Sequence, residues 1–144
     1  MMRALLSAFM CFLPLAAAPG DSAKPQYVAV AFHDVVDQRG GASDSVTTAN
    51  LISFFEWLRG NRWTAITLDD IERARSGERA LPDRSVLITF DDGYESLYTR
   101  VYPLLLVYKI PVVASLVGSW MEGRERETVH TGDDLIPGSH LLIS

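Results

Sequence analysis

Apolar runs alternate with helical patterns along residues 26–117, and this alternation is the strongest constraint on the fold. Four short runs rich in apolar and β-branched residues predict strands, at residues 26–32, 63–67, 85–90 and 111–117. Three helical segments are predicted between them, at residues 48–60, 67–76 and 95–108. Strands that are apolar enough to be covered on both faces are typical of parallel sheets packed between helices. The sequence therefore predicts an α/β fold with parallel strands.

Several residues mark where the predicted helices begin and end. Thr48 can cap the first helix and Gly60 is well placed to end it. Residues 67–70 (Thr-Leu-Asp-Asp) read as a capping sequence, with carboxylates at the positive end of the second helix. Pro103 predicts a fresh helical start within residues 95–108, because its ring does not fit inside a continuous turn. We predict a polar loop at residues 33–47.

The length of the chain limits how much of such a fold it can form. The chain has 144 residues, and four strands are about half the number in a closed barrel, which typically needs roughly 200 residues or more. From Met121 onward a charged stretch is followed by residues without a clear strand or helix pattern. The fold is therefore predicted to be either a small open sheet or part of a (β/α) barrel.

Residues 1–23 have the features of a secretory signal peptide. Arg3 precedes an apolar run from Ala4 to Ala18, which ends in three consecutive alanines. We therefore expect an exported protein of the periplasm or cell envelope. The one cysteine, Cys11, lies in this segment, so the mature chain would contain neither a disulfide nor a thiolate metal site. The formal net charge of −5 and the scattered basic residues argue against a nucleic-acid partner.

Two groups of chemically capable residues follow predicted strands. Asp91, Asp92 and Gly93 end the third strand, and His33 with Asp34 ends the first. Adjacent carboxylates at a strand end can divide two tasks, one binding a cation and the other accepting a proton from water. Simpler interpretations remain open: Asp-Asp-Gly is a common turn and helix cap, and a lone histidine is more often a hydrogen-bonding residue. Trp120 could stack on a sugar ring.

Residues 88–94 (Ile-Thr-Phe-Asp-Asp-Gly-Tyr) resemble the first motif of the polysaccharide deacetylases, the NodB-homology group or carbohydrate esterase family four. Further segments resemble the poly-β-1,6-N-acetylglucosamine deacetylases of Gram-negative biofilms, at residues 31–36, 50–63, 67–71, 102–105 and 118–121. The ordered set spans residues 27–137, so we predict residues 24–137 to be the N-terminal part of a deacetylase domain.

The resemblance implies a partial (β/α) barrel that removes N-acetyl groups from a β-linked N-acetylglucosamine polysaccharide, with a divalent metal such as zinc, nickel or cobalt. By position, Asp91 would be the general base and Asp92 a metal ligand, and His33 would line the same pocket and bind substrate. Trp120 is the other expected substrate-binding residue, from its capacity to stack on a sugar ring. The polysaccharide is the expected partner, together with envelope export machinery.

The sequence also departs from the family pattern. The family supplies two histidines three or four residues apart, whereas His130 and His140 are ten apart in a stretch without a clear element. We therefore expect an incomplete metal site, a truncated deacetylase with little or no activity alone, and an aberrant tail at residues 138–144. Two alternatives remain: a non-catalytic glycan-binding or assembly protein of the envelope, and a magnesium-dependent hydrolase or phosphatase that uses the paired aspartates.

Overall fold

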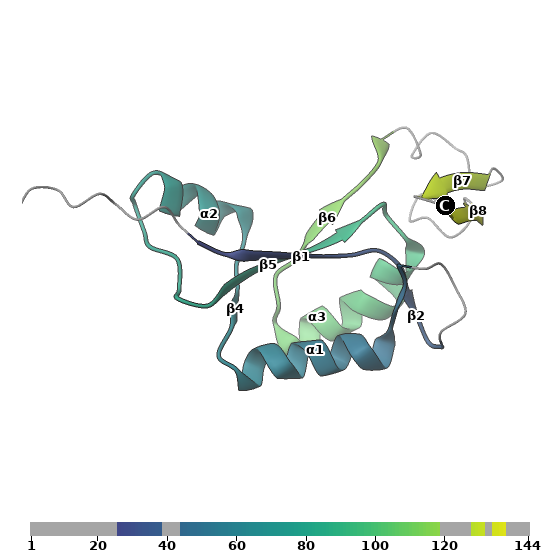
Figure 1. Cartoon of the computed structure of the whole chain (residues 1–144), viewed down its shortest axis with the longest axis horizontal. Coiled ribbons are helices and arrows are strands. Elements are labelled where there is room, and N and C mark those ends of the chain that lie inside the picture. Colours follow the sequence, from purple (N-terminus) through teal and green to yellow (C-terminus); the bar gives the residue numbers. More distant parts are fainter. Residues whose placement is uncertain (1–25, 39–43, 119–127, 132–133, 138–144) are drawn as a thin grey trace, which may run out of the picture.

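The protein is described by a computed structural model that covers residues 26–38, 44–118, 128–131 and 134–137. Its central sheet contains four strands: β1 (Val28–Phe32), β4 (Thr64–Ala65), β5 (Ser85–Asp91) and β6 (Val113–Ser115). β5 lies in the middle, with β1 along one edge and with β4 and β6 on successive halves of the other (Figure 1). All of these pairings are parallel, which confirms the predicted α/β class.

The helical segments follow the predicted order. They are α1 (Thr48–Gly60), α2 (Leu68–Arg75), a π-helical turn η1 (Leu97–Val101) and α3 (Tyr102–Tyr108). α1 and α3 lie on the same side of the sheet (Figure 1). Pro103 lies in the first turn of α3, as predicted, and η1 precedes it where one continuous α-helix would place the ring against the preceding turn.

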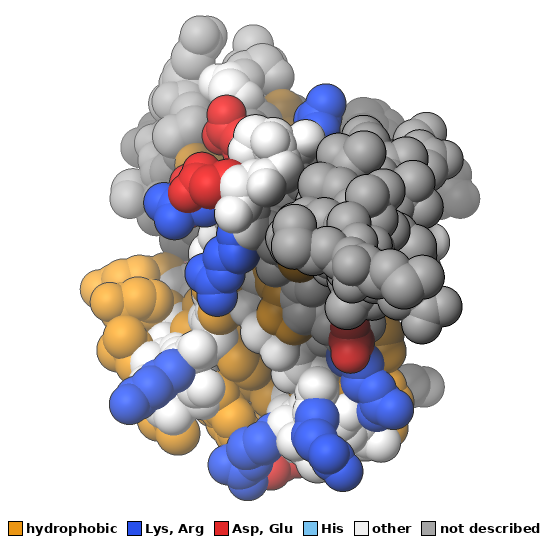
Figure 2. Space-filling view, turned by 90° about the vertical axis from the view of Figure 1, so that its left-hand side faces the viewer, with side chains coloured by type: hydrophobic (Ala, Val, Ile, Leu, Met, Phe, Trp, Pro, Cys, Tyr) orange, Lys and Arg blue, Asp and Glu red, His pale blue; other side chains and the backbone are white. Residues whose placement is uncertain are grey.

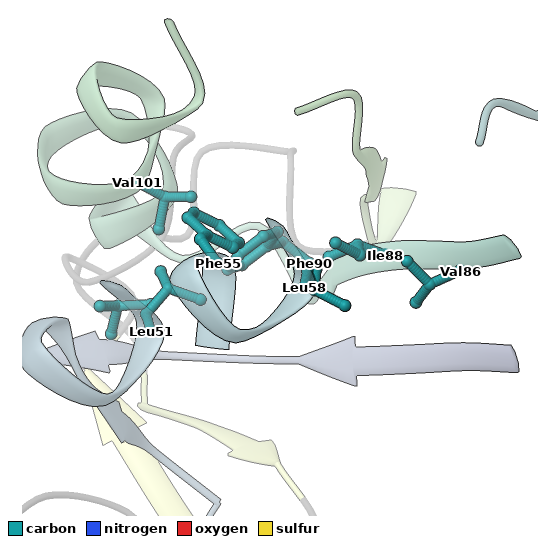
Figure 3. Packing of buried hydrophobic residues seen from close by; sticks show 8 residues of the cluster. Leu51, Phe55, Leu58, Val86, Ile88, Phe90 and Val101 are labelled. Carbon is teal, nitrogen blue, oxygen red and sulfur yellow. The ribbon is translucent and has the colours of Figure 1, made fainter. Parts of the chain in front are cut away.

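The hydrophobic core lies between the sheet and the two helices α1 and α3. Side chains alternate along β5, so every second residue faces the helices. These residues, together with buried side chains of α1 and η1, form one cluster (Figure 3): Val35, Leu51, Phe55, Leu58, Val86, Ile88, Phe90 and Val101. The ring of Phe32 stacks on that of Phe90 with centroids 5.4 Å apart, which extends the core onto β1.

The face of β1 that points away from the hydrophobic core differs from the prediction. Ala29 and Ala31, which alternate onto this face, are exposed, so β1 is not covered on both faces as its apolar sequence suggested. The reason is that α1 and α3 both pack on the other side of the sheet (Figure 1). β5 does match the expectation, since four consecutive residues from Ser85 to Ile88 are buried.

Three further local expectations need correction. The N-cap of α1 is Thr47 rather than Thr48: its hydroxyl accepts the Asn50 N–H at 3.2 Å. The predicted loop at 33–47 contains the paired parallel strands β2 (Val35–Val36) and β3 (Val46–Thr47). The region after residue 121 contains an antiparallel hairpin of β7 (Thr128–Thr131) and β8 (Asp134–Pro137). Such short segments carry too few residues for a periodic pattern to show.

Other expectations concern residues outside the described part of the chain, namely the signal segment 1–23, Trp120, His140 and the tail 138–144. Among the described helices, none is both long and apolar enough to span a membrane. Figure 2 shows the basic side chains of one face at separate positions rather than in one continuous patch.

Candidate active site at the carboxyl ends of β1 and β5

The pairing of β1 with β5 brings the candidate residues together. Phe32 lies beside Phe90 at the end of the register, so the next residues, His33 and Asp91, lie at the same edge of the sheet. In parallel α/β folds this carboxyl edge is where catalytic groups gather. Asp91 is the last residue of β5 and alternates onto the side of the sheet opposite Phe90. It therefore points away from the hydrophobic core.

Asp91 carries a buried oxygen that has no hydrogen-bond partner in the described part of the chain. This atom is Oδ1, whereas the residue as a whole is only partly buried. A buried polar atom without a partner is unfavourable, and such atoms are uncommon in folded proteins. Asp91 Oδ1 is thus an acceptor whose hydrogen-bonding capacity none of the described residues uses.

Asp92 adopts a backbone conformation that is unusual for a residue other than glycine. Its φ is 71°, and the following Gly93 has a φ of 78°. Two successive residues in the left-handed region turn the chain sharply after β5. Gly93 is also closely packed, because a Cβ atom there would lie 3.0 Å from Cδ2 of Leu116. Such backbone conformations are often found at functional sites.

His33 lies between two carboxylates. Its Nε2 is 3.9 Å from Oδ2 of Asp92, and its Nδ1 is 3.6 Å from Oδ2 of Asp44. Burial raises the pKa of Asp92, the nearby Asp91 and Asp44 charges raise it further, and His33 opposes them. The site therefore holds one imidazole between the carboxylates of Asp92 and Asp44, with Asp91 next to Asp92 in the chain.

Sequence reasoning missed Asp44 as a site residue. It lies in the stretch predicted as a plain polar loop, and no motif or spacing connects it with His33. The link is tertiary: β3 pairs with β2, and the Val46 N–H donates to the Asp34 carbonyl at 3.0 Å. This short pairing brings Asp44 back beside His33.

Asp34 does not share the partners of His33, although the two are adjacent. Its Oδ1 accepts a hydrogen bond of 2.7 Å from the Ser96 hydroxyl, and it lines a cavity of about 280 Å³ with Glu95 and Arg100. His33 is not among the residues that line this cavity. Ser96 is a second residue without a sequence signal.

The described residues include side chains of the types that bind divalent metals, but too few of them lie together to form a metal site. The Asp92 carboxylate and the His33 imidazole are suitable ligand types for zinc and similar ions. Within the described ranges, however, no three histidine, cysteine or acidic side chains are grouped so that they could hold a metal ion. His130 lies on β7, and the structure does not describe its side chain.

Comparison with known proteins supports a common origin with deacetylases. A family profile described as "Polysaccharide deacetylase" matches residues 78–134, which include β5 and the Asp91–Gly93 turn. The poly-β-1,6-N-acetyl-D-glucosamine N-deacetylase of Escherichia coli K12 is 40% identical over 114 residues. That alignment covers 76% of this chain and 16% of the relative.

Two solved structures are similar in both sequence and fold. A de-N-acetylase from Aggregatibacter actinomycetemcomitans is 28% identical with a TM-score of 0.70. The BpsB deacetylase domain from Bordetella bronchiseptica is 31% identical with a TM-score of 0.62. Each match covers 80% of this chain and 46% of the solved chain, so this chain spans less than half of either. With the matched profile and the Escherichia coli relative, these likenesses show that the chain belongs to the polysaccharide deacetylase family.

Proposed function

We propose that this chain supplies the aspartate part of a site that removes N-acetyl groups from a β-1,6-linked N-acetylglucosamine polysaccharide. The observation that carries the proposal is the buried Oδ1 of Asp91, which has no hydrogen-bond partner among the described residues, beside the partly buried Asp92 with its positive φ. The substrate class follows from the relatives, which are named as deacetylases of this polymer. In this proposal Asp91 is the general base and Asp92 is a metal ligand.

The two aspartates suit different tasks because their surroundings differ. Asp92 lies within 3.9 Å of His33, whereas Asp91 offers an oxygen without a partner among the described residues. Asp91 would accept the proton of the water that attacks the acetyl carbonyl carbon. Cleavage of the C–N bond then gives acetate and a free amine, which takes up a proton. His33 would orient Asp92 and line the substrate pocket, and Trp120 stays a predicted sugar-stacking residue.

The proposed cofactor is a divalent cation such as zinc, nickel or cobalt. When bound, such an ion polarises a carbonyl and lowers the pKa of its water. Asp92 is the described residue that would hold it, and further ligands would have to come from other residues. We further propose that the protein works in the periplasm or cell envelope, after export directed by residues 1–23.

A metal-binding measurement on a hybrid protein tests these roles. The hybrid is the Escherichia coli relative with its aligned segment replaced by the sequence of this chain. Asp92→Asn is expected to weaken zinc binding at least roughly tenfold, because a charged ligand is lost. Asp91→Asn should leave zinc binding within about threefold, because Asp91 is proposed as a base rather than a ligand.

Asp69→Asn is the matched control, since Asp69 is an exposed carboxylate on α2, outside the cluster around His33. If Asp91→Asn weakened zinc binding as much as Asp92→Asn, the division of roles would be wrong. If neither variant changed it, the aspartates would not be part of a metal site.

A further inference from the structure

The Ser96 hydroxyl joins two segments of the site that are far apart in the sequence. Ser96 is 4% exposed, and its Oγ accepts the Val35 N–H at 3.0 Å. The same hydroxyl donates to Oδ1 of Asp34 at 2.7 Å. A serine hydroxyl has one proton to donate, so this arrangement uses its donor and one of its acceptor positions.

These bonds connect the loop of His33 to the segment that follows Asp92. Asp34 and Val35 come directly after His33, and both are hydrogen-bonded to Oγ of Ser96. Ser96 lies four residues after Asp92, just before η1. A hydrogen bond to an ionised carboxylate is stronger than one between neutral groups, and burial strengthens it further. The distance between His33 and Asp92 therefore depends on this connection.

Asp34 also holds the third segment of the site. Its backbone carbonyl accepts the Val46 N–H at 3.0 Å, and Asp44 lies two residues earlier. Asp34 thus contacts Ser96 through its side chain and Val46 through its backbone. The segments that carry His33, Asp44 and Asp92 meet at this one residue.

We infer that Asp34 and Ser96 are positioning residues, which set the His33 imidazole against Asp92 and Asp44 without contacting substrate. The inference rests on the proposed function only in that His33 and Asp92 are the site residues assigned there. It predicts that loss of the Ser96 hydroxyl displaces His33 while the hydrophobic core stays intact, because Ser96 contacts the core residue Val35 through its backbone N–H and is not itself a member of the core cluster.

The test is the NMR signal of the His33 imidazole in the full chain, recorded at one fixed pH. The signal is assigned by its loss in His33→Gln. Ser96→Ala is expected to shift it and to make the Val35 amide exchange with solvent roughly tenfold faster, because that N–H loses its acceptor. Thr99→Ala is the matched control. Its exposed hydroxyl donates to the Glu95 carbonyl within the same helical segment, so the His33 signal should stay in place.

A second pair of variants separates positioning from a loss of folding. Asp34→Asn keeps an acceptor oxygen for Ser96 and should shift the His33 signal less than Asp34→Ala does. Asp34→Ala leaves the Val35–Ser96 bond in place, so it remains informative if Ser96→Ala fails to fold. An unchanged His33 signal in folded Asp34→Ala or Ser96→Ala protein would overturn the inference. Since the signal does not depend on acetate release, a failure of the proposed function would be seen separately.

Discussion

Asp92 combines a strained backbone with a charge that folding disfavours. Its φ of 71° lies in the left-handed region, and burial raises the pKa of its carboxyl. A raised carboxyl pKa means that the protonated form is favoured in the folded state. The contribution of this carboxyl to the free energy of unfolding is fully present at a pH below the ordinary carboxyl pKa. It is lost as the pH rises through the raised pKa of Asp92.

This argument predicts that Asp92→Asn stabilises the chain at neutral pH. Asparagine tolerates the left-handed conformation and carries no charge, so the variant avoids the unfavourable ionisation. The melting temperature should exceed that of the wild type at about pH 7.5, and the difference should shrink by about pH 4.5. A variant that is less stable at neutral pH, by a margin independent of pH, would contradict the assignment.

Gly93 allows a second prediction at the residue scale. Alanine there would adopt a positive φ and would place its Cβ 3.0 Å from Leu116. Gly77 has nearly the same φ, 77°, but open space around it. We expect Gly77→Ala to lower the free energy of unfolding by about 1 kcal/mol and Gly93→Ala by about 2 kcal/mol.

Urea denaturation of both glycine variants measures the difference. If the two lost equal stability, the packing of Leu116 against the turn would contribute nothing. The comparison therefore separates the conformational requirement, which both positions share, from the close approach, which only Gly93 has of the two.

The predictability of the site also divides residue by residue. Asp91, Asp92 and His33 follow apolar runs, so their places at strand ends could be read from the sequence. Asp44 and Ser96 could not be found in this way. Their contacts with His33 and Asp34 span non-local stretches of chain and depend on tertiary structure. Trp120 stays a prediction, because it lies outside the described residues.

At the scale of the elements, the capping box of α2 is the clearest local determinant. The Thr67 hydroxyl accepts the Asp70 N–H at 3.1 Å, and Asp70 Oδ2 accepts the Thr67 N–H at 2.9 Å. These bonds to Thr67 lower the pKa of Asp70, so their contribution is present above the ordinary carboxyl pKa and is lost as the pH falls through the lowered value.

Thr67→Ala should therefore lower the free energy of unfolding by about 1 kcal/mol at neutral pH, because the first turn loses its cap. Thr99→Ala is the control, since its exposed hydroxyl bonds within one helical turn, and it should change stability by less than about 0.5 kcal/mol. Urea denaturation at pH 7 provides the measurement. Equal values for the two variants would mean that α2 does not depend on its cap.

The elements also show which patterns sequence reasoning can use. α1, α2 and β5 are long enough for spacing and capping signals to fix them within one or two residues. β2 and β3 have two residues each, and their pairing depends on the Asp34–Val46 contact rather than on any local pattern. The N-cap of α1 was misplaced by one residue because Thr47 and Thr48 are both competent caps.

At the scale of the whole molecule, the sheet is covered by α1 and α3 on one side (Figure 1), while β1 exposes Ala29 and Ala31 on the other. Asp91 alternates onto this second side. The parallel α/β class was predictable because the order of strands and helices determines it. The extent to which the second side of the sheet is covered was not predictable, because it depends on which segments pack there.

The central claim is that Asp91 acts as the base of a deacetylase site, and acetate release tests it most directly. The substrate is poly-β-1,6-N-acetylglucosamine, and the hybrid protein is assayed with added zinc. Asp91→Asn should slow acetate release by roughly 10²–10⁴-fold, as expected for loss of a general base. Asp83→Asn is the matched control, because Asp83 is exposed and precedes the same strand, and it should leave the rate unchanged. An Asp91→Asn hybrid as active as the Asp83→Asn hybrid would contradict the account.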